Sequence, residues 1–390
     1  MVNHMKAQMS ARHIPALDGI RGLAALGIFI FHYGGSHSSN SLIRLAGVVI
    51  NFGWAAVSLF FVLSGFLISG ILWDSFDTAN WWRRFYWRRS LRIFPLYYFA
   101  LLLIFVSTLL VQGHQWPLGS LWPFLVYLQN TPPLYPVWNK FPNAFALSHF
   151  WSLAVEEQFY LIWPFLLVWR RGSNVSARNM CLLVWALSFG FRVAVYFTGM
   201  KDIWAIAFLA ARAGELAMGA YLALAIRDAT TKAFVLKHAY LFFAGSLVAI
   251  VGVMIWANGA DLRTFPMATV GVAVNGVLFA SLIALCLQPG AVASIFSMRW
   301  LRWLGKISYG IYVYHILLNP LFVWIVARTF PGLGHDAHFL AIAIVAAVGT
   351  LTVATLSFYG FEAPILRLKP SSEKVVRRTK STAIATESGN

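Results

Sequence analysis

The stretch IRGLAALGIFIFHYG, residues 20–34, decides the fold class of this sequence. Its centre is an apolar run of several helical turns, yet Arg21 stands at one end and His32 near the other. In an α-helix the eleven steps from Arg21 to His32 cover about 16 Å and return almost to the same face. Charged groups within a bilayer usually face the interior of a helix bundle. The pattern therefore predicts a membrane-crossing helix whose two polar side chains point into one cavity.

The composition of the whole chain also indicates a membrane protein. Charged residues make up 11% of its 390 residues, whereas soluble domains carry roughly 25%. Long apolar runs recur, for example LYYFALLLIFVSTLLV and LFFAGSLVAIVGVMIW. Runs of about 18 or more mostly apolar residues are candidate membrane helices, so a water-soluble multidomain protein is excluded. No small-residue cleavage site follows the first run, which is interpreted as an uncleaved helix rather than a signal peptide.

These runs predict an all-α fold, a single bundle of about ten transmembrane helices. The predicted helices are residues 17–33, 54–73, 93–111, 149–169, 180–197, 203–226, 238–256, 266–286, 306–328 and 338–361. No internal repeat divides the bundle, so residues 17–365 form one predicted transmembrane domain. Residues 1–16 precede it on the cytoplasmic side, and the basic, polar residues 366–390 are expected to be a disordered cytoplasmic tail. Residues 112–148, rich in Pro, Trp and Tyr, are expected to be a non-helical connection outside the cytoplasm.

The distribution of basic residues predicts the orientation of the bundle. The formal net charge is +17, and in the ten-helix scheme most Lys and Arg residues fall on the side that holds both termini. Cytoplasmic connections of membrane proteins carry such an excess, so both termini are predicted to be cytoplasmic. The charge then needs no nucleic acid as a partner, and the lipid bilayer is the expected surrounding. The two cysteines, Cys181 and Cys286, lie in apolar runs without disulfide or metal-binding spacing, so no metal site is expected.

The ionisable residues of the first helix have two interpretations. Asp18 precedes Arg21 by one helical turn and is expected to pair with it. Arg21 and His32 would then serve a polar cavity inside the bundle. The alternative is that Arg21 is a topology anchor and that His32 is an interfacial residue at the other helix end.

A second polar group lies in HFWSLAVEEQFYLIWP, residues 149–164. Ser152, Glu156 and Tyr160 recur every four positions and therefore share one helix face. Glu157 stands directly beside Glu156. One carboxylate can neutralise a buried arginine, and the other would be free to orient or charge a histidine.

Arginines form two further patterns. In WWRRFYWRRSLRIFPLYY, residues 81–98, Arg89 and Arg92 are one helical turn apart and would make a clamp for phosphate groups. The alternative is a set of cytoplasmic anchors within an interfacial aromatic belt. Arg212 and Glu215 are spaced i,i+3 inside one helix and are interpreted as a pair that neutralises itself.

The last polar pattern lies in LGKISYGIYVYHILL, residues 304–318. Ser308, Tyr312 and His315 lie along one stripe of the predicted helix. His315 would be near the middle of the membrane, where an ionisable group suggests function. The alternative is a histidine that is hydrogen-bonded within the bundle.

Together these stretches resemble the acyltransferase-3 family of bacterial multipass membrane proteins, which acylate surface polysaccharides, lipid-linked glycans, antibiotics and similar acceptors. The resemblance covers most of residues 13–365. Its carriers are LDGIRGLAALGIFIFHY, FFVLSGFLISGIL, RRSLRIFPLYY, WSLAVEEQFYLIWP and GKISYGIYVYH, whose order and separation together are highly specific. The resemblance implies a multi-pass protein of the bacterial cytoplasmic membrane. Some relatives carry an appended extracytoplasmic domain that this sequence is not expected to have, so the transmembrane domain is expected to act alone or with a partner.

The resemblance also implies roles for the matching residues. The family pattern of a basic residue, ten positions and a histidine is matched by Arg21 and His32, and its Arg-x-x-Arg pattern by Arg89 and Arg92. His32 would be catalytic, and the arginines would serve acyl-coenzyme A, most often acetyl-coenzyme A. This donor is a co-substrate, and no permanently bound cofactor is implied. The acceptor would be a hydroxyl of an extracytoplasmic or lipid-linked carbohydrate.

A mechanism follows as a hypothesis. The phosphates of acyl-coenzyme A would stay at the arginine-lined cytoplasmic mouth, and the pantetheine arm would carry the thioester to His32, a general base for the acceptor hydroxyl. Glu156 or Glu157 would orient His32, and nearby hydroxyls would donate to the oxyanion. Direct transfer and an acyl-histidine intermediate both remain open. The residues expected to support or orient the reacting groups are Asp18, Ser152, Tyr160, Tyr312 and His315.

Two functions of other classes compete with this hypothesis. Buried His, Glu and Arg side chains also form proton relays in secondary transporters and flippases. That alternative predicts broken helices at matching places of two repeats, and no repeat is found. A membrane scaffold for polysaccharide assembly is the third possibility, for which the His32→Ala substitution would be harmless.

Overall fold

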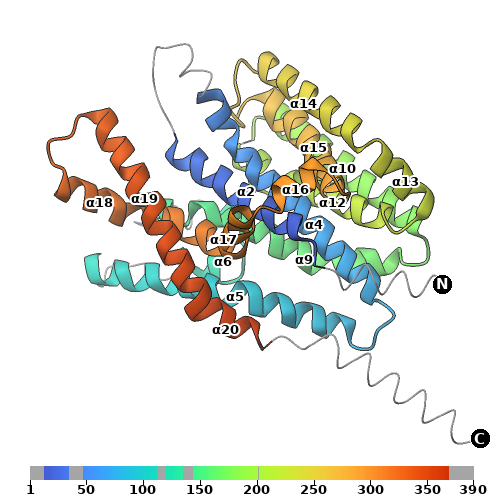
Figure 1. Ribbon diagram of the computed structural model, residues 1–390, viewed down its shortest axis with the longest axis horizontal. Coiled ribbons are helices and arrows are strands. Elements are labelled where there is room, and N and C mark those ends of the chain that lie inside the picture. Colours follow the sequence, from blue (N-terminus) through green and yellow to red (C-terminus); the bar gives the residue numbers. More distant parts are fainter. Residues whose placement is uncertain (1–12, 35–46, 113–119, 135–143, 201, 369–390) are drawn as a thin grey trace, which may run out of the picture.

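The computed structural model describes residues 13–34, 47–112, 120–134, 144–200 and 202–368, and this part of the chain is helical without strands (Figure 1). The all-α prediction is therefore confirmed for the described residues. The predicted N-terminal segment 1–16 and tail 366–390 fall almost wholly outside them. Both cysteines are buried and free, as expected.

Each of the ten predicted helices overlaps a helix of the structure. The long helices are α2 (Pro15–Tyr33), α4 (Ala55–Ser75), α5 (Trp81–Gln112), α9 (Trp151–Trp169), α10 (Asn174–Phe197), α12 (Leu209–Ala225), α14 (Ala239–Trp256), α15 (Val272–Cys286), α17 (Arg299–Leu317) and α19 (His335–Ser357). The shorter ones are α6 (Trp122–Leu125), α8 (Ala144–Leu147), α11 (Asp202–Ile206), α13 (Ala229–Lys237), α16 (Ala291–Phe296), α18 (Asn319–Thr329) and α20 (Ala363–Leu366). Five single helical turns complete the described elements: η1 (Phe52–Trp54), η3 (Pro132–Leu134), η4 (Ser148–Phe150), η5 (Met267–Gly271) and η6 (Phe358–Glu362).

The predicted number of about ten membrane crossings is not confirmed. Eight helical segments of the described chain are long and apolar enough to cross a membrane, and a ninth follows if the bent pair α17 and α18 counts as one span. The helix α9, which carries two glutamates, is not among these segments. The chain is thus a multi-span membrane protein by length and composition of its helices.

Three predicted boundaries were wrong. The basic connection 81–92 is not a loop but the start of α5, a helix of 32 residues, because arginine and aromatic side chains are compatible with a helix. Residues 306–328 do not form one straight helix, since α17 and α18 meet at 60°, where Pro320 fits the first turn of a new helix. The connection 112–148 is not free of helix, because α6 and α8 lie within its described part.

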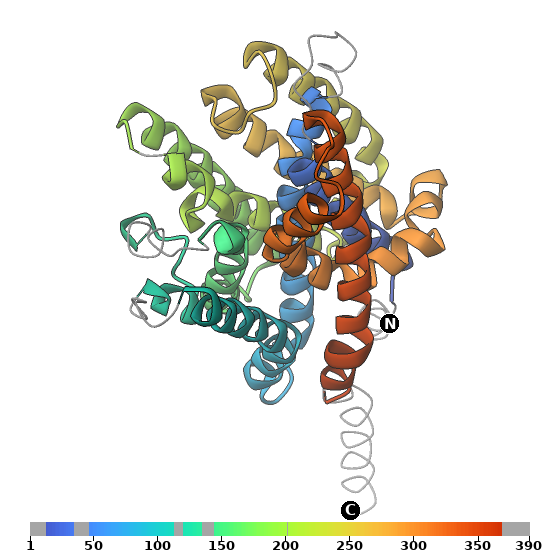
Figure 2. The same ribbon diagram turned by 90° about the vertical axis from the view of Figure 1, so that its left-hand side faces the viewer.

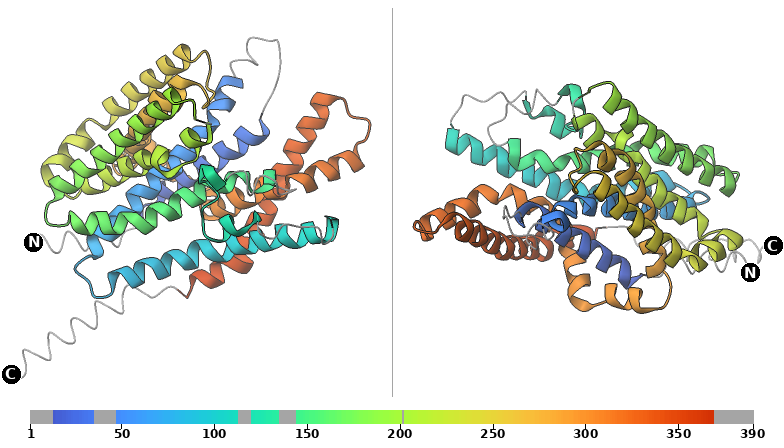
Figure 3. Two further views of the ribbon diagram at one scale, coloured as in Figure 1. Left: turned by 180° about the vertical axis from the view of Figure 1, so that it is seen from behind. Right: turned by 90° about the horizontal axis from the view of Figure 1, so that it is seen from above.

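Two closely packed helix pairs form the centre of the bundle. The helix α2 packs along α17, and α4 packs along α12. A Cβ atom on Gly305 would lie 1.9 Å from the Asp18 carbonyl oxygen, and one on Gly219 would lie 1.9 Å from the Val62 oxygen. Only glycine permits these approaches, as is common where membrane helices touch. The helices α5 and α19 flank this centre on one side, and α13 and α14 lie on the other (Figures 1 and 3).

One end of the bundle is fixed by ion pairs. Here α4, α9 and α12 end, and Arg227 bonds Asp74 at 2.6 Å across the ends of α12 and α4. Asp228 caps the start of α13, and hydrogen bonds from Thr231 hold the pKa of its carboxyl below its usual range. The residues at and beside the connections that follow these helices include Arg83, Arg84, Arg170, Arg171, Arg178 and Arg227. We therefore call this the basic end of the bundle, and Figure 2 shows the same helices from the side.

Candidate active site

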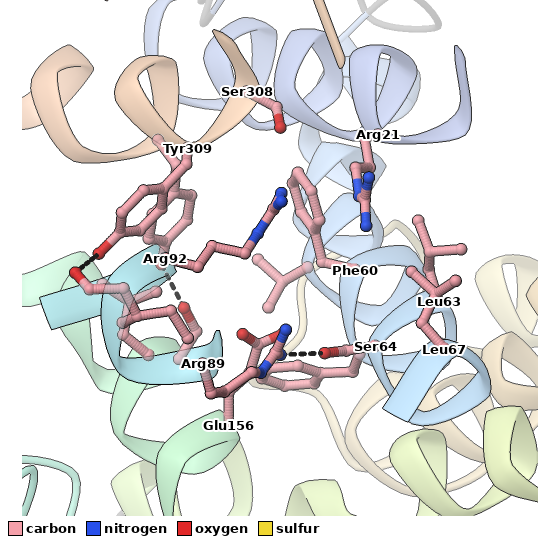
Figure 4. Close-up of a pocket in the computed structure, with 16 residues that line it drawn as sticks. Arg21, Phe60, Leu63, Ser64, Leu67, Arg89, Arg92, Glu156, Ser308 and Tyr309 are labelled. Carbon is pink, nitrogen blue, oxygen red and sulfur yellow. Dashed lines mark hydrogen bonds between the residues drawn. The ribbon is translucent and has the colours of Figure 1, made fainter. Parts of the chain in front are cut away.

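Two cavities lie along α2. The first, which we call the arginine cavity, has a volume of about 110 Å³ and lies between α2, α4, α5, α9 and α17. Arg21, Arg89 and Arg92 point into it, and Glu156 and Ser308 add polar groups to its wall (Figure 4). Sequence positions almost three hundred residues apart thus meet in one polar site.

Arg21 and Arg89 are held in the arginine cavity by different contacts. The Arg21 guanidinium donates to Asp18 at 3.2 Å, as predicted from the helical spacing. Arg89 lies 3.9 Å above the ring of Tyr160 and donates to the Ser64 hydroxyl at 3.4 Å. The hydroxyls of Ser64 and Tyr160 are hydrogen-bonded to each other. Aromatic and hydroxyl groups therefore fix the position of Arg89 without consuming all of its donors.

The lining of this cavity holds more guanidinium groups than carboxylates. Arg21, Arg89 and Arg92 lie close enough to repel one another, and Glu156 is the carboxylate among the lining residues. Asp18, Glu157 and Glu362 act on the guanidinium groups from outside the lining. Planar guanidinium forks gathered in one cavity suit a phosphate-bearing ligand.

Glu157 lies apart from this cavity. It does not line either of the two cavities, and its Oε1 atom is buried without a hydrogen bond within the described chain. Its charge acts on Arg89, as does that of Glu156. Both Glu156 and Glu157 therefore lie near Arg89. Neutralisation of a buried arginine is the role that the sequence suggested for one of the two.

The second cavity lies further along α2. This histidine cavity has a volume of about 460 Å³, within the usual range of ligand pockets. His32 and His149 line it, together with the aromatic side chains of Trp54, Trp151 and Tyr312. Its size and aromatic walls suit a ring-shaped ligand.

The hydrogen bonds of two histidines fix their tautomers. His315 is buried and its Nδ1 lies 2.8 Å from the Tyr312 carbonyl oxygen, so Nδ1 carries the proton and Nε2 is an acceptor. His32 Nδ1 lies 2.9 Å from the Ile28 carbonyl oxygen and 3.3 Å from His315 Nε2. The Nδ1 of His32 is therefore the donor. Its Nε2 atom makes no hydrogen bond with a described residue, which leaves it able to accept a proton as a general base does.

The predicted single cavity is divided in two. Arg21 lines the arginine cavity and His32 lines the histidine cavity, although both lie on α2 as expected. Val57 and Tyr312 line both cavities and form the shared wall. The Tyr312 hydroxyl is held there by hydrogen bonds with Ser152 and with the His149 carbonyl.

The expected contact between a carboxylate and His32 is not found among the described residues. The hydrogen-bond partners of His32 are a backbone carbonyl and His315, whereas Glu156 lines the other cavity. The i,i+4 spacing placed Glu156 on the same helix face as Ser152 correctly, but a shared face does not fix which cavity each side chain enters. The predicted pairing was wrong for that reason.

Sequence reasoning missed His149. Its ring centre lies 5.1 Å from that of His315 and 5.2 Å from that of Tyr312, so three histidines gather at the histidine cavity. The sequence did offer a signal for His149: it stands three residues before Ser152, at the start of the polar stretch 149–164. Among the described residues no group of three or more His, Cys, Asp or Glu side chains is arranged to hold a metal ion.

The family model of an acyltransferase domain, acyltransferase 3, matches residues 14–359, and the chain belongs to this family. Individual proteins of known name are also similar in sequence to this chain. The peptidoglycan O-acetyltransferase OatA of Listeria monocytogenes is 28% identical over 378 residues, covering 91% of this chain and 56% of that protein. The O-acetyltransferase OatA of Staphylococcus aureus is 26% identical over 350 residues, covering 82% of this chain and 52% of that protein. The chain thus spans about half the length of these relatives, and no solved structure matches it.

Proposed function

We propose that this chain is a membrane O-acyltransferase that moves an acyl group, most simply acetyl, from acyl-coenzyme A to a carbohydrate hydroxyl. The observation that carries the proposal is the arrangement along α2, with three arginines in one cavity and His32 in the next. The names of the relatives support an O-acetyltransferase with a peptidoglycan-like acceptor. The excess of basic residues at the basic end supports a cytoplasmic location for that end, in the bacterial cytoplasmic membrane.

The arginine cavity would bind the donor. The phosphates of acyl-coenzyme A would pair with Arg21, Arg89 and Arg92, because bidentate guanidinium groups are well suited to phosphate oxygens. Glu156 would limit the repulsion between these cations when the site is empty. The thin pantetheine arm would then extend toward the histidine cavity, and Tyr312 would have to turn aside to let the thioester pass.

His32 would start the chemical step. Its Nε2 takes the proton of the acceptor hydroxyl while the oxygen attacks the thioester carbon. The tetrahedral oxyanion accepts hydrogen bonds from hydroxyls at the shared wall, Tyr312 and Ser152. The carbon–sulfur bond then breaks, and the proton on His32 passes to the leaving thiolate. His315 would take the orienting role that was assigned to a carboxylate, since its Nε2 accepts from His32 Nδ1.

The decisive experiment is transfer of labelled acetyl from acetyl-coenzyme A by the purified protein in lipid nanodiscs, with peptidoglycan fragments as acceptors. Labelled acceptor identified by mass spectrometry is the expected result. Uptake of solutes into vesicles without any transfer would support the transporter or flippase alternative instead. Full acetyl transfer by the His32→Ala variant would point to a different base, whereas the scaffold alternative predicts no transfer by the purified wild-type protein.

A further inference from the structure

Arg212 is a buried cation in the wall of the histidine cavity, and the mechanism above does not use it. Its Nε atom lies 2.9 Å from the Glu215 carboxylate, and its Nη2 donates to Glu215 at 3.1 Å and to Ser58 at 3.2 Å. Its Nη1 atom makes no hydrogen bond within the part of the chain that the structure describes. A buried donor without a partner is unfavourable, so a ligand that supplies an acceptor would stabilise this wall.

The buried charges around Arg212 leave a positive excess. Arg192 on α10 is buried as well, and its guanidinium donates to Ser188 at 2.8 Å. Both guanidinium groups act on a single buried carboxylate, that of Glu215. Arg192 and Arg212 therefore share the carboxylate of Glu215 near the start of α12. Electrostatic interactions are strong where water is excluded, so the site attracts one further negative charge.

The exposed residues that line the histidine cavity do not cancel the excess positive charge around Arg212. Asp261 and Arg263 also line the histidine cavity, but both are exposed, and their opposite charges offset each other. Trp54 and Trp151 add flat aromatic faces, against which the apolar face of a sugar ring can pack. The cavity thus combines sugar-compatible walls with one cationic wall, which is made by Arg212.

We infer that the histidine cavity takes an acidic carbohydrate, whose carboxylate pairs with Arg212 while its reacting hydroxyl faces His32. This inference rests on the proposed function and names the class of its acceptor. A carboxylate fits better than a phosphate dianion, because the excess amounts to one positive charge. The pairing would also hold the sugar in one orientation, so a single hydroxyl would be acylated.

The test compares two peptidoglycan sugars that differ by one lactyl carboxylate, N-acetylmuramic acid and N-acetylglucosamine. The purified full chain in nanodiscs is expected to acetylate the acidic sugar with a kcat/KM at least about tenfold higher. In the variant Arg212→Gln, this preference should fall to near one. Glu215 keeps the charge of Arg192 as its counterion in this variant, so the substitution leaves no carboxylate at this site without an opposite charge. The variant Arg328→Gln, on the exposed end of α18, is the matched control and should keep the preference.

Two results would overturn the inference while leaving the proposed function intact. One is equal or better transfer to the neutral sugar by the wild-type chain, and the other is an acid preference that survives in the Arg212→Gln variant. Hydrolysis of acetyl-coenzyme A without transfer to either sugar would also overturn it, because the donor site would then work without an acceptor of this class. The absence of both hydrolysis and transfer with every acceptor would instead count against the proposed function itself.

Discussion

The imidazole of His32 is oriented by a neutral neighbour rather than by an acid. Its Nδ1 faces the Ile28 carbonyl and the Nε2 of His315, and its Nε2 makes no hydrogen bond within the described part of the chain. The residue lines the histidine cavity. The sequence pointed to His32 through its place in the helix and its family pattern. Its partner could not be predicted, because the contact joins two helices 283 positions apart.

Replacing His32 with alanine should remove the general base. Positioned acid–base catalysis contributes about 100- to 10,000-fold, so kcat for acetyl transfer should fall by at least about 100-fold with the KM for acetyl-coenzyme A little changed. The control is His335→Ala, an exposed histidine at the start of α19. A loss of less than tenfold in the His32 variant, measured by label transfer, would argue that another group takes the proton.

Replacing His315 should separate orientation from catalysis. The His315→Leu variant loses the acceptor for His32 Nδ1 and should lower kcat by about tenfold, whereas His315→Gln keeps an acceptor oxygen and should recover part of that loss. Steady-state kinetics of both variants provide the measurement. Equal losses in the two variants would indicate that His315 serves only to fill space in the core.

At the scale of elements, α5 carries two kinds of arginine. Arg89 and Arg92 line the arginine cavity, while Arg83, two turns earlier on the same helix, is exposed. The periodic hydrophobic pattern predicted that this helix exists but placed its start too late, since cations at its beginning looked like a loop. The spacing of Arg89 and Arg92 correctly indicated a shared face, because helical periodicity applies wherever the helix begins.

The two classes of arginine should behave differently when they are neutralised. The variants Arg89→Gln and Arg92→Gln should each raise the KM for acetyl-coenzyme A by about tenfold or more, because a hydrogen bond to a charged group contributes about 1.5–3 kcal/mol. Arg83→Gln should leave this KM within about twofold. Unchanged KM values for the cavity arginines would place the donor phosphates elsewhere.

The contact between α2 and α17 depends on glycine. In the variant Gly305→Ala the new Cβ would meet the Asp18 carbonyl oxygen at 1.9 Å, so the helices must separate at a cost of about 1–3 kcal/mol. Thermal unfolding in detergent should begin at a lower temperature. Gly245→Ala on α14, with no atom within 4 Å of the new carbon, should be neutral or stabilising. An unshifted transition in Gly305→Ala would contradict this packing.

At the scale of the whole molecule, the two cavities follow each other from the basic end toward the opposite end of α2. The sequence predicted a bundle and one polar path, because hydropathy and helical spacing report faces and depths. It did not predict the wall at Val57 and Tyr312, because that wall depends on hydrogen bonds between α17 and the start of α9. The path is therefore a pair of sites separated by Val57 and Tyr312.

The measurement that tests this account most directly uses vesicles in which the protein has a single known orientation. Acetyl-coenzyme A is supplied only on the face that carries the basic end, and the carbohydrate acceptor is present only on the other face. The account predicts labelled acceptor across the membrane, and none with the His32→Ala variant. Acetylation that occurs only when donor and acceptor share one face would contradict it.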